Sequence, residues 1–254
     1  MPPTPRKPPR KRKSVGPGRL TNPPITEAQI DFQLANFSPI SVETIRLIAA
    51  QFARQYPLLS DQPLLQMQVN VGGGPLQSTS WGFGGVIRRS TDARDVLLCR
   101  MDGCAYSRLA PYGSWEEILP RALAIWNAYR QATGAGAARV TVRYLNVIHI
   151  PAEAPDLYSY LKYPPDAPLS KASTVRGFYS MVTMFETDSR IQASVLQSAL
   201  PGPIADRVPI ALNVEAFLDN VEPSAIAASL DLLRKTKNRL FFGSLTPLAL
   251  RPYR

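Results

Sequence analysis

The chain is poor in the residue types that most metal sites and many catalytic sites use. It contains one histidine, His149, and two cysteines, Cys99 and Cys104. One histidine and a C-x4-C pair cannot supply the four ligands of a tetrahedral zinc site. We therefore expect no metal and no cofactor. We also expect the two thiols to be reduced and, five residues apart in an extended segment, to point to opposite faces of a strand.

Long apolar runs are also absent. No stretch approaches the roughly eighteen apolar residues that a membrane span requires. The basic N-terminus is followed by proline, glycine and asparagine instead of an apolar secretory core. We expect no membrane association and a cytoplasmic location.

Acidic residues are missing from residues 1–24, where prolines are interspersed with seven lysine and arginine residues. Such a segment cannot bury enough apolar area to offset the entropy of ordering, so we expect a disordered or polyproline-like tail. Without these seven, the 29 basic residues of the chain fall to 22 against 19 acids. The body of the chain therefore carries only about +3 of the net charge of +10.

The strongest structural signal is the run R-V-T-V-R-Y-L-N-V-I-H-I at residues 139–150, which is rich in β-branched residues. Its length and composition predict a strand near the middle of a sheet. Both alternating series of residues in this strand are largely apolar, so we expect both of its faces to be covered.

The segments on either side of this run have a similar predicted order of elements. Up to residue 138, the patterns predict a strand at 25–37, a helix at 41–56, strands at 64–71, 80–89 and 95–109, and a helix at 114–134. After the run, they predict a short helix at 156–162, strands at 177–186, 190–199 and 208–218, and a helix from 224 to about 242. Asp102-Gly103 is either a hairpin turn or a bulge; we favour a bulge, because no separate partner is evident for 104–109.

This order predicts an α+β fold with an internal pseudo-duplication of a βαβββα unit. We expect antiparallel sheets with the long helices packed on one face. The predicted organisation is a disordered, basic, Pro-rich tail at 1–24, a first half at 25–138 and a second half at 139–254. The halves share no detectable residue identity, so the inference rests on element order.

Three short motifs carry a resemblance to a known family. They are Y-x-x-W at Tyr112 and Trp115, R-Y-L-N at residues 143–146, and L-T-P at residues 245–247. Their order over most of residues 25–250 resembles a sporadically distributed prokaryotic family of uncharacterised proteins. The resemblance implies a fold and no reaction. Members of that family often have a Leu-His pair where this chain has Leu233 and Arg234, so a role for that histidine does not carry over.

The predicted central strand holds one group of candidate binding residues. Arg143, Asn146 and His149 are polar residues in a largely apolar run. A buried guanidinium needs an anionic partner, so we interpret these residues as an anion or ligand site; the alternative is an internal pairing that fixes strand register. His149 is also a candidate general base, although no second histidine or nearby acid pair orients it, and the alternative is a structural histidine.

A second group of candidate residues is basic. Its members belong to the tail and to the last predicted helix: Arg10, Lys11, Arg12, Lys13, Arg234, Lys235, Lys237 and Arg239. On the helix, we place the four cations opposite the apolar positions Ile226, Leu230 and Leu233. We interpret the group as contacts to the phosphates of a polyanion. The alternatives are a solubilising tail and a solvated helix face that suits the helix dipole.

Three hypotheses of function follow. The first is an intracellular, non-enzymatic binding protein that engages nucleic acid or another polyanion through its tail and last helix. The second is a protein-interaction or antitoxin-like accessory component of a prokaryotic defence locus. The third is a hydrolase or transferase that uses Arg143 and His149. We assign no catalytic residue and favour binding over catalysis.

Overall fold

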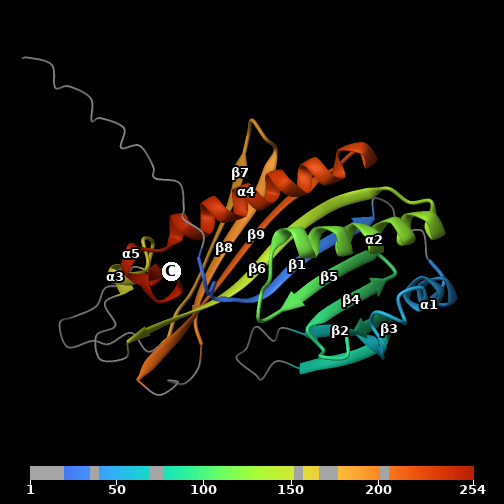
Figure 1. The fold of residues 1–254 in the computed structure, drawn as a ribbon, viewed down its shortest axis with the longest axis horizontal. Helices are drawn as coiled ribbons and strands as arrows, with labels where there is room; N and C mark the ends of the chain where they lie inside the picture. The colour runs from blue at the N-terminus through green and yellow to red at the C-terminus, as the bar shows by residue number, and fades with distance from the viewer. Residues whose placement is uncertain (1–19, 35–39, 69–76, 152–156, 166–176, 201–205) are drawn as a thin grey trace, which may run out of the picture.

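The computed structural model describes residues 20–34, 40–68, 77–151, 157–165, 177–200 and 206–254 (Figure 1). The tail cations Arg10, Lys11, Arg12 and Lys13 lie outside the described residues, so the structure does not bear on their predicted role. Among the described residues, no helix combines the length and the apolar character that a membrane crossing needs.

The described residues form one antiparallel sheet with the strand order β2-β3-β4-β5-β1-β6-β9-β8-β7. Its strands are β1 (Ile25–Leu34), β2 (Leu58–Gln68), β3 (Gln77–Arg89), β4 (Asp95–Arg100), β5 (Gly103–Leu109), β6 (Ala137–Pro151), β7 (Tyr179–Glu186), β8 (Ile191–Ala199) and β9 (Arg207–Asp219). The helices are α1 (Val42–Ala50), α2 (Trp115–Thr133), α3 (Leu157–Tyr160), α4 (Ile226–Ser244) and α5 (Pro247–Leu250). The predicted α+β class is confirmed.

Strand β6 occupies the middle of the sheet, as predicted. It pairs with β1 on one side and β9 on the other, so that Val142 lies between Ile30 and Ala216. The even-numbered residues of β6 from 140 to 150 are buried, whereas the odd-numbered residues from 143 to 149 are only partly buried. The prediction that both faces are covered is therefore wrong for this second face.

The segment 95–109 is a hairpin and not one bulged strand. Strand β4 ends at Arg100, and β5 begins at Gly103 and pairs with both β4 and β1. Gly103 has φ +149°, and a Cβ at this position would collide with the carbonyl oxygen of Phe32. Glycine is required because the β1 backbone approaches so closely. The first half of the chain therefore has five strands, and the predicted βαβββα order is wrong there by one strand.

The same hairpin corrects the prediction for the two cysteines. Cys99 and Cys104 are directly opposite one another in the β4–β5 register, and both are free and fully buried. Residues that are opposite each other in an antiparallel pair share one face. The two thiols therefore point into the same core and not to opposite faces.

Side-chain caps explain where the two helices of the first half begin. The Ser41 hydroxyl accepts a hydrogen bond from the Thr44 backbone N–H, and the Ser114 hydroxyl accepts one from the Glu117 backbone N–H. At the other end of α2, Gly134 adopts the left-handed conformation with φ +69°. Helix α1 ends at Ala50, earlier than predicted, because the chain continues to Tyr56 in tighter turns before Pro57.

Helices α2 and α4 both pack against strands of the sheet. Trp126 of α2 stacks on Phe32 of β1 with ring centroids 5.1 Å apart, and Leu230 and Leu233 of α4 belong to the same apolar cluster. A second cluster surrounds Phe241, towards the other end of α4. Figure 1 shows α4 passing over β8 and β9, and α2 lying beside β1 and β5. Leu240 packs against both clusters.

Candidate functional site

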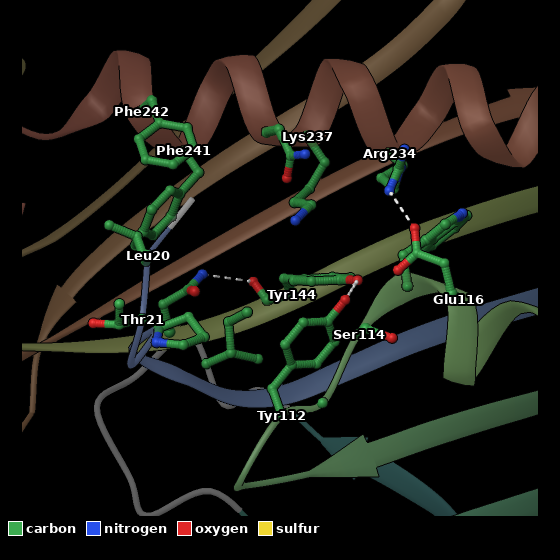
Figure 2. Close-up of a pocket in the computed structure, with 16 residues that line it drawn as sticks. Leu20, Thr21, Tyr112, Ser114, Glu116, Tyr144, Arg234, Lys237, Phe241 and Phe242 are labelled. Carbon is green, nitrogen blue, oxygen red and sulfur yellow. Dashed lines mark hydrogen bonds and ion pairs between the residues drawn. The ribbon is translucent and has the colours of Figure 1, made fainter. Parts of the chain in front are cut away.

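A cavity of about 730 Å³ lies between the sheet and the two long helices (Figure 2). Its walls come mainly from three regions: residues of the segment from Leu20 to Ile25, the segment from Tyr112 to Glu116 that leads into α2, and the second half of α4. Tyr144 and Asn146 of β6 also line it. The volume is within the range of small-molecule binding sites.

Lys237 is the central residue of this cavity. Figure 2 shows its side chain extending from α4 towards Tyr144, and its Nζ lies 3.3 Å from the centroid of the Tyr144 ring. The residue is only 5% exposed. A lysine this deeply buried is rare unless it is paired with an acid.

No acid in the described part of the chain forms an ion pair with Lys237. Burial and, to a smaller extent, the positive charge of Arg234 together lower the pKa of the Lys237 amine to about 7. Its contact with the ring face of Tyr144 is a cation–π interaction. This interaction replaces part of the stabilisation that water would give the ammonium group, but it supplies no negative charge. The amine therefore changes charge near neutral pH.

Arg234 provides a second cation one helical turn earlier. Its guanidinium lies 3.5 Å from the Glu116 carboxylate and 3.2 Å from the Asp231 carboxylate, and 5.4 Å from the centroid of the Trp115 ring. Its Nε is buried without a hydrogen-bond partner among the described residues. The acids thus neutralise Arg234 in part, and they leave one of its donors unused.

Two tyrosines form a hydroxyl pair in the same wall. The hydroxyl oxygens of Tyr112 and Tyr144 are 2.9 Å apart, and Tyr144 is almost completely buried. Burial raises the pKa of both phenols, so both remain protonated at neutral pH. One of their two O–H groups forms the mutual hydrogen bond, which leaves one hydroxyl proton to donate to a ligand.

The other end of the cavity is apolar. Leu20, Phe241 and Phe242 line it, and Figure 2 shows these three side chains together on one side of Lys237. Phe241 follows Lys237 by four residues on α4, which places the two side chains on one face of the helix. The cavity therefore has a cationic end and an apolar end.

The structure separates the three predicted residues of β6. Asn146 lines the cavity, where its amide donates hydrogen bonds to the carbonyl oxygens of Tyr144 and Leu212. Arg143 and His149 have odd numbers and lie on the opposite face of the sheet. There, Arg143 is 3.8 Å from the Glu27 carboxylate, and the backbone N–H of His149 donates to the Tyr253 hydroxyl.

The predicted row of cations on the last helix is not a uniform exposed surface. Lys235 pairs with Asp231 at 2.8 Å, and Arg239 pairs with Glu186. Lys237 lies on the buried side of α4 together with Leu233, so its predicted placement opposite the apolar positions is wrong. Its spacing of four residues from both Leu233 and Phe241 was the available signal for burial. Sequence reasoning did not identify the Tyr112–Tyr144 pair or the apolar end, because each joins distant segments.

Two of the motifs that carry the family resemblance contribute side chains to this cavity. Tyr112 and Trp115 come from Y-x-x-W, and Tyr144 and Asn146 come from R-Y-L-N. No group of three or more His, Cys, Asp and Glu side chains in the described segments could hold a metal ion. Comparison of the sequence with protein-family models and with curated proteins finds no match.

Proposed function

We propose that the protein binds a small organic anion with an apolar portion in the cavity between β6, α2 and α4. The observation that carries this proposal is Lys237, a buried cation in a cavity wall that has no carboxylate partner among the described residues. A buried charge is strongly unfavourable unless it is paired. An anionic ligand would provide the missing partner.

The two ends of the cavity indicate the chemistry of the ligand. Lys237, Arg234 and the free hydroxyl of the tyrosine pair provide donors for a negatively charged head group. Phe241 and Phe242 provide an apolar surface next to it. The N-terminus of α2 also borders the cationic end, although Glu116 offsets its effect. A medium-chain carboxylate matches both ends.

Isothermal titration calorimetry of the whole protein at pH 6 tests this proposal. The ligands are octanoate, octanol, which keeps the chain without the charge, and inorganic phosphate, which keeps a charge without the chain. We expect octanoate to bind about tenfold more tightly than either, because a charge-assisted hydrogen bond contributes about 1.5–3 kcal/mol.

Two substitutions localise the binding. Lys237→Met should weaken octanoate binding by about tenfold or more, because it removes the unpaired cation. Lys235→Met is the matched control: this lysine is 67% exposed and already paired with Asp231, so binding should not change. Equal affinity for octanoate and octanol, or unchanged octanoate affinity in Lys237→Met, contradicts the proposal.

As a second candidate function, we propose that the edge strand β7 pairs with a strand of another protein chain. Tyr179, Met181 and Phe185 lie at alternating positions of β7 and are 68%, 57% and 62% exposed. In the described sheet, β7 pairs with β8 and has no strand on its other side. An edge with free backbone groups and large apolar side chains is a template for strand addition.

A second copy of the chain is the partner with which to test this candidate. Sedimentation velocity should show concentration-dependent dimers, and Phe185→Lys should weaken dimerisation by about tenfold, the effect of a moderate interface hot spot. Leu47→Lys, a similar change at an exposed residue of α1, is the control. A monomer at every concentration, or equal dimerisation of both variants, contradicts this candidate.

We further propose that residues 25–138 and 139–254 are two copies of one unit. The strand order supports this proposal, because the sequence β1-β5-β4-β3 on one side of the sheet centre corresponds to β6-β9-β8-β7 on the other. The two central strands β1 and β6 are antiparallel neighbours, which is what a two-fold relation requires. Strand β2 is then an addition to the first copy.

A further inference from the structure

Lys237 has a feature that anion binding alone does not require. Its amine is buried next to another cation, Arg234, and its other neighbour, the Tyr144 ring, carries no charge. Lys237 Nζ faces the ring of Tyr144, and Arg234 lies one helical turn away. A lysine becomes a nucleophile when desolvation or an adjacent cation favours its neutral form. Both conditions hold here, because burial and Arg234 each act on this amine.

We propose that Lys237 forms an imine with the carbonyl group of a 2-oxo acid that has an apolar chain. This inference rests on the proposed function, because the same cavity holds the ligand. Arg234 faces the carboxylate, Lys237 reaches the adjacent carbonyl carbon, and the chain lies along Phe241 and Phe242. In a 2-oxo acid, the carboxylate and the reactive carbonyl carbon are adjacent. Arg234 and Lys237 are likewise neighbours in the cavity wall.

The step balances without an oxidant or reductant. The neutral amine of Lys237 attacks the carbonyl carbon, and one proton of its nitrogen moves to the carbonyl oxygen, which gives a carbinolamine. The free hydroxyl of the Tyr112–Tyr144 pair donates a second proton to this oxygen, which leaves as water while the nitrogen lone pair forms the C=N bond of a protonated imine. The phenol then takes a proton from solvent, so the net step consumes one proton and releases one water molecule. The protonated imine keeps the positive charge that Lys237 supplied before the reaction.

The groups that face the amine set its pH dependence. Tyr144 on β6 and Arg234 on α4 act on the amine directly, and the other titratable residues of the cavity wall are Tyr112, just before α2, and Glu116 in the first turn of α2. The raised pKa of both phenols keeps them protonated through neutral pH. The rate of imine formation should therefore rise as pH increases through about 7, where Lys237 loses its proton.

Reductive trapping of the whole protein with 2-oxooctanoate and cyanoborohydride tests the inference. We expect one adduct per chain, with a mass equal to the protein plus the acid, minus one water and plus two hydrogens. Peptide mapping should place it on Lys237. Lys237→Met should lose the adduct, and Lys235→Met should keep it.

Octanoate separates this inference from the proposed function. It has the same chain without the carbonyl group, so it should bind and form no adduct. Lys237→Arg has no nucleophilic amine, so it should lose trapping. Octanoate binding without any 2-oxooctanoate adduct on Lys237 overturns the imine and leaves the proposed function standing. If octanoate does not bind either, both are overturned.

Discussion

A single side chain, Lys237, combines the unusual energetics of this molecule with its proposed role. Leu233 and Phe241, four residues before and after it on the buried side of α4, are apolar, and a methionine of similar length would avoid the cost of burying a charge. Sites that bind or react often carry such a cost, because function and stability make different demands on the same residue. The free-energy cost of burying Lys237 can therefore be measured without any ligand.

Lys237→Met should make the protein more stable, by about 1–4 kcal/mol at pH 6, because it removes an unpaired buried charge. The folded-state pKa of about 7 lies below the ordinary value of 10.5, so the folded chain binds fewer protons than the unfolded chain between these values. Wild-type stability should therefore rise with pH across that window, and the advantage of the variant should shrink towards pH 10. Urea denaturation at several pH values measures this.

Lys235→Met provides the comparison for that experiment. This exposed ion pair with Asp231 should change stability by less than about 1 kcal/mol. A Lys237→Met protein that is less stable than wild type at pH 6, while Lys235→Met behaves as expected, would mean that Lys237 has a stabilising role in the fold.

Local sequence signals identified where α1 and α2 begin and where α2 ends, but they did not identify the β4–β5 hairpin. The predicted helix limits at residues 41, 114 and 134 coincide with the caps Ser41, Ser114 and Gly134, because a cap depends on residues a few positions away. To recognise the hairpin, one has to know that β5 pairs with β1. In this pairing Cys104 lies opposite Phe32, which is some seventy residues earlier in the sequence. Sequence patterns do not show such a partner, so the segment was interpreted as one strand.

The corrected hairpin predicts the reactivity of its thiols. Burial raises the pKa of Cys99 to about 12, and burial also raises the pKa of Cys104. Thiolate is the reactive form, so the folded protein should not react with a thiol reagent such as DTNB at pH 8. In denaturant, both thiols should react. Rapid release of one equivalent from the folded protein would contradict the burial of this pair.

An acid connects this hairpin with helix α2. The Asp95 carboxylate accepts hydrogen bonds from the Tyr106 hydroxyl at 2.6 Å, from Arg108 at 3.0 Å and from Arg121 at 2.7 Å. Asp95→Asn should lower stability by about 1.5–3 kcal/mol, because it weakens charge-assisted hydrogen bonds in a buried position. Thermal denaturation measures the loss. Asp61→Asn, which affects an exposed pair with Arg46, is the control and should have little effect.

At the scale of the whole molecule, the sheet is continuous through its centre. The length and β-branched composition of β6 were sufficient to predict a central strand, and the order of elements was sufficient for the α+β class. The cavity was not predictable in the same way, because it joins Tyr112, Tyr144 and Lys237 from three separate segments. The sequence predicted Asn146 as a ligand residue and Arg234 and Lys237 as polyanion contacts, but it did not place them in one cavity.

A continuous centre predicts that both halves unfold together. Val142 is fully buried between Ile30 of the first half and Ala216 of the second. Val142→Ala should cost about 2 kcal/mol. In hydrogen-exchange mass spectrometry, this substitution should accelerate the exchange of β1 and β9 amides together. Acceleration confined to residues 139–254 would show that the halves are independently stable units.

The most direct measurement is the pKa of the Lys237 amine itself. An NMR titration of the lysine side-chain signals, with Lys237→Met to assign the resonance, follows this one group in the intact protein. The account predicts a midpoint at about pH 7, because the amine is buried next to Arg234. A midpoint near the ordinary value of 10.5 would contradict it, since the amine would then be solvated or paired and would not be the unpaired group on which the binding site depends.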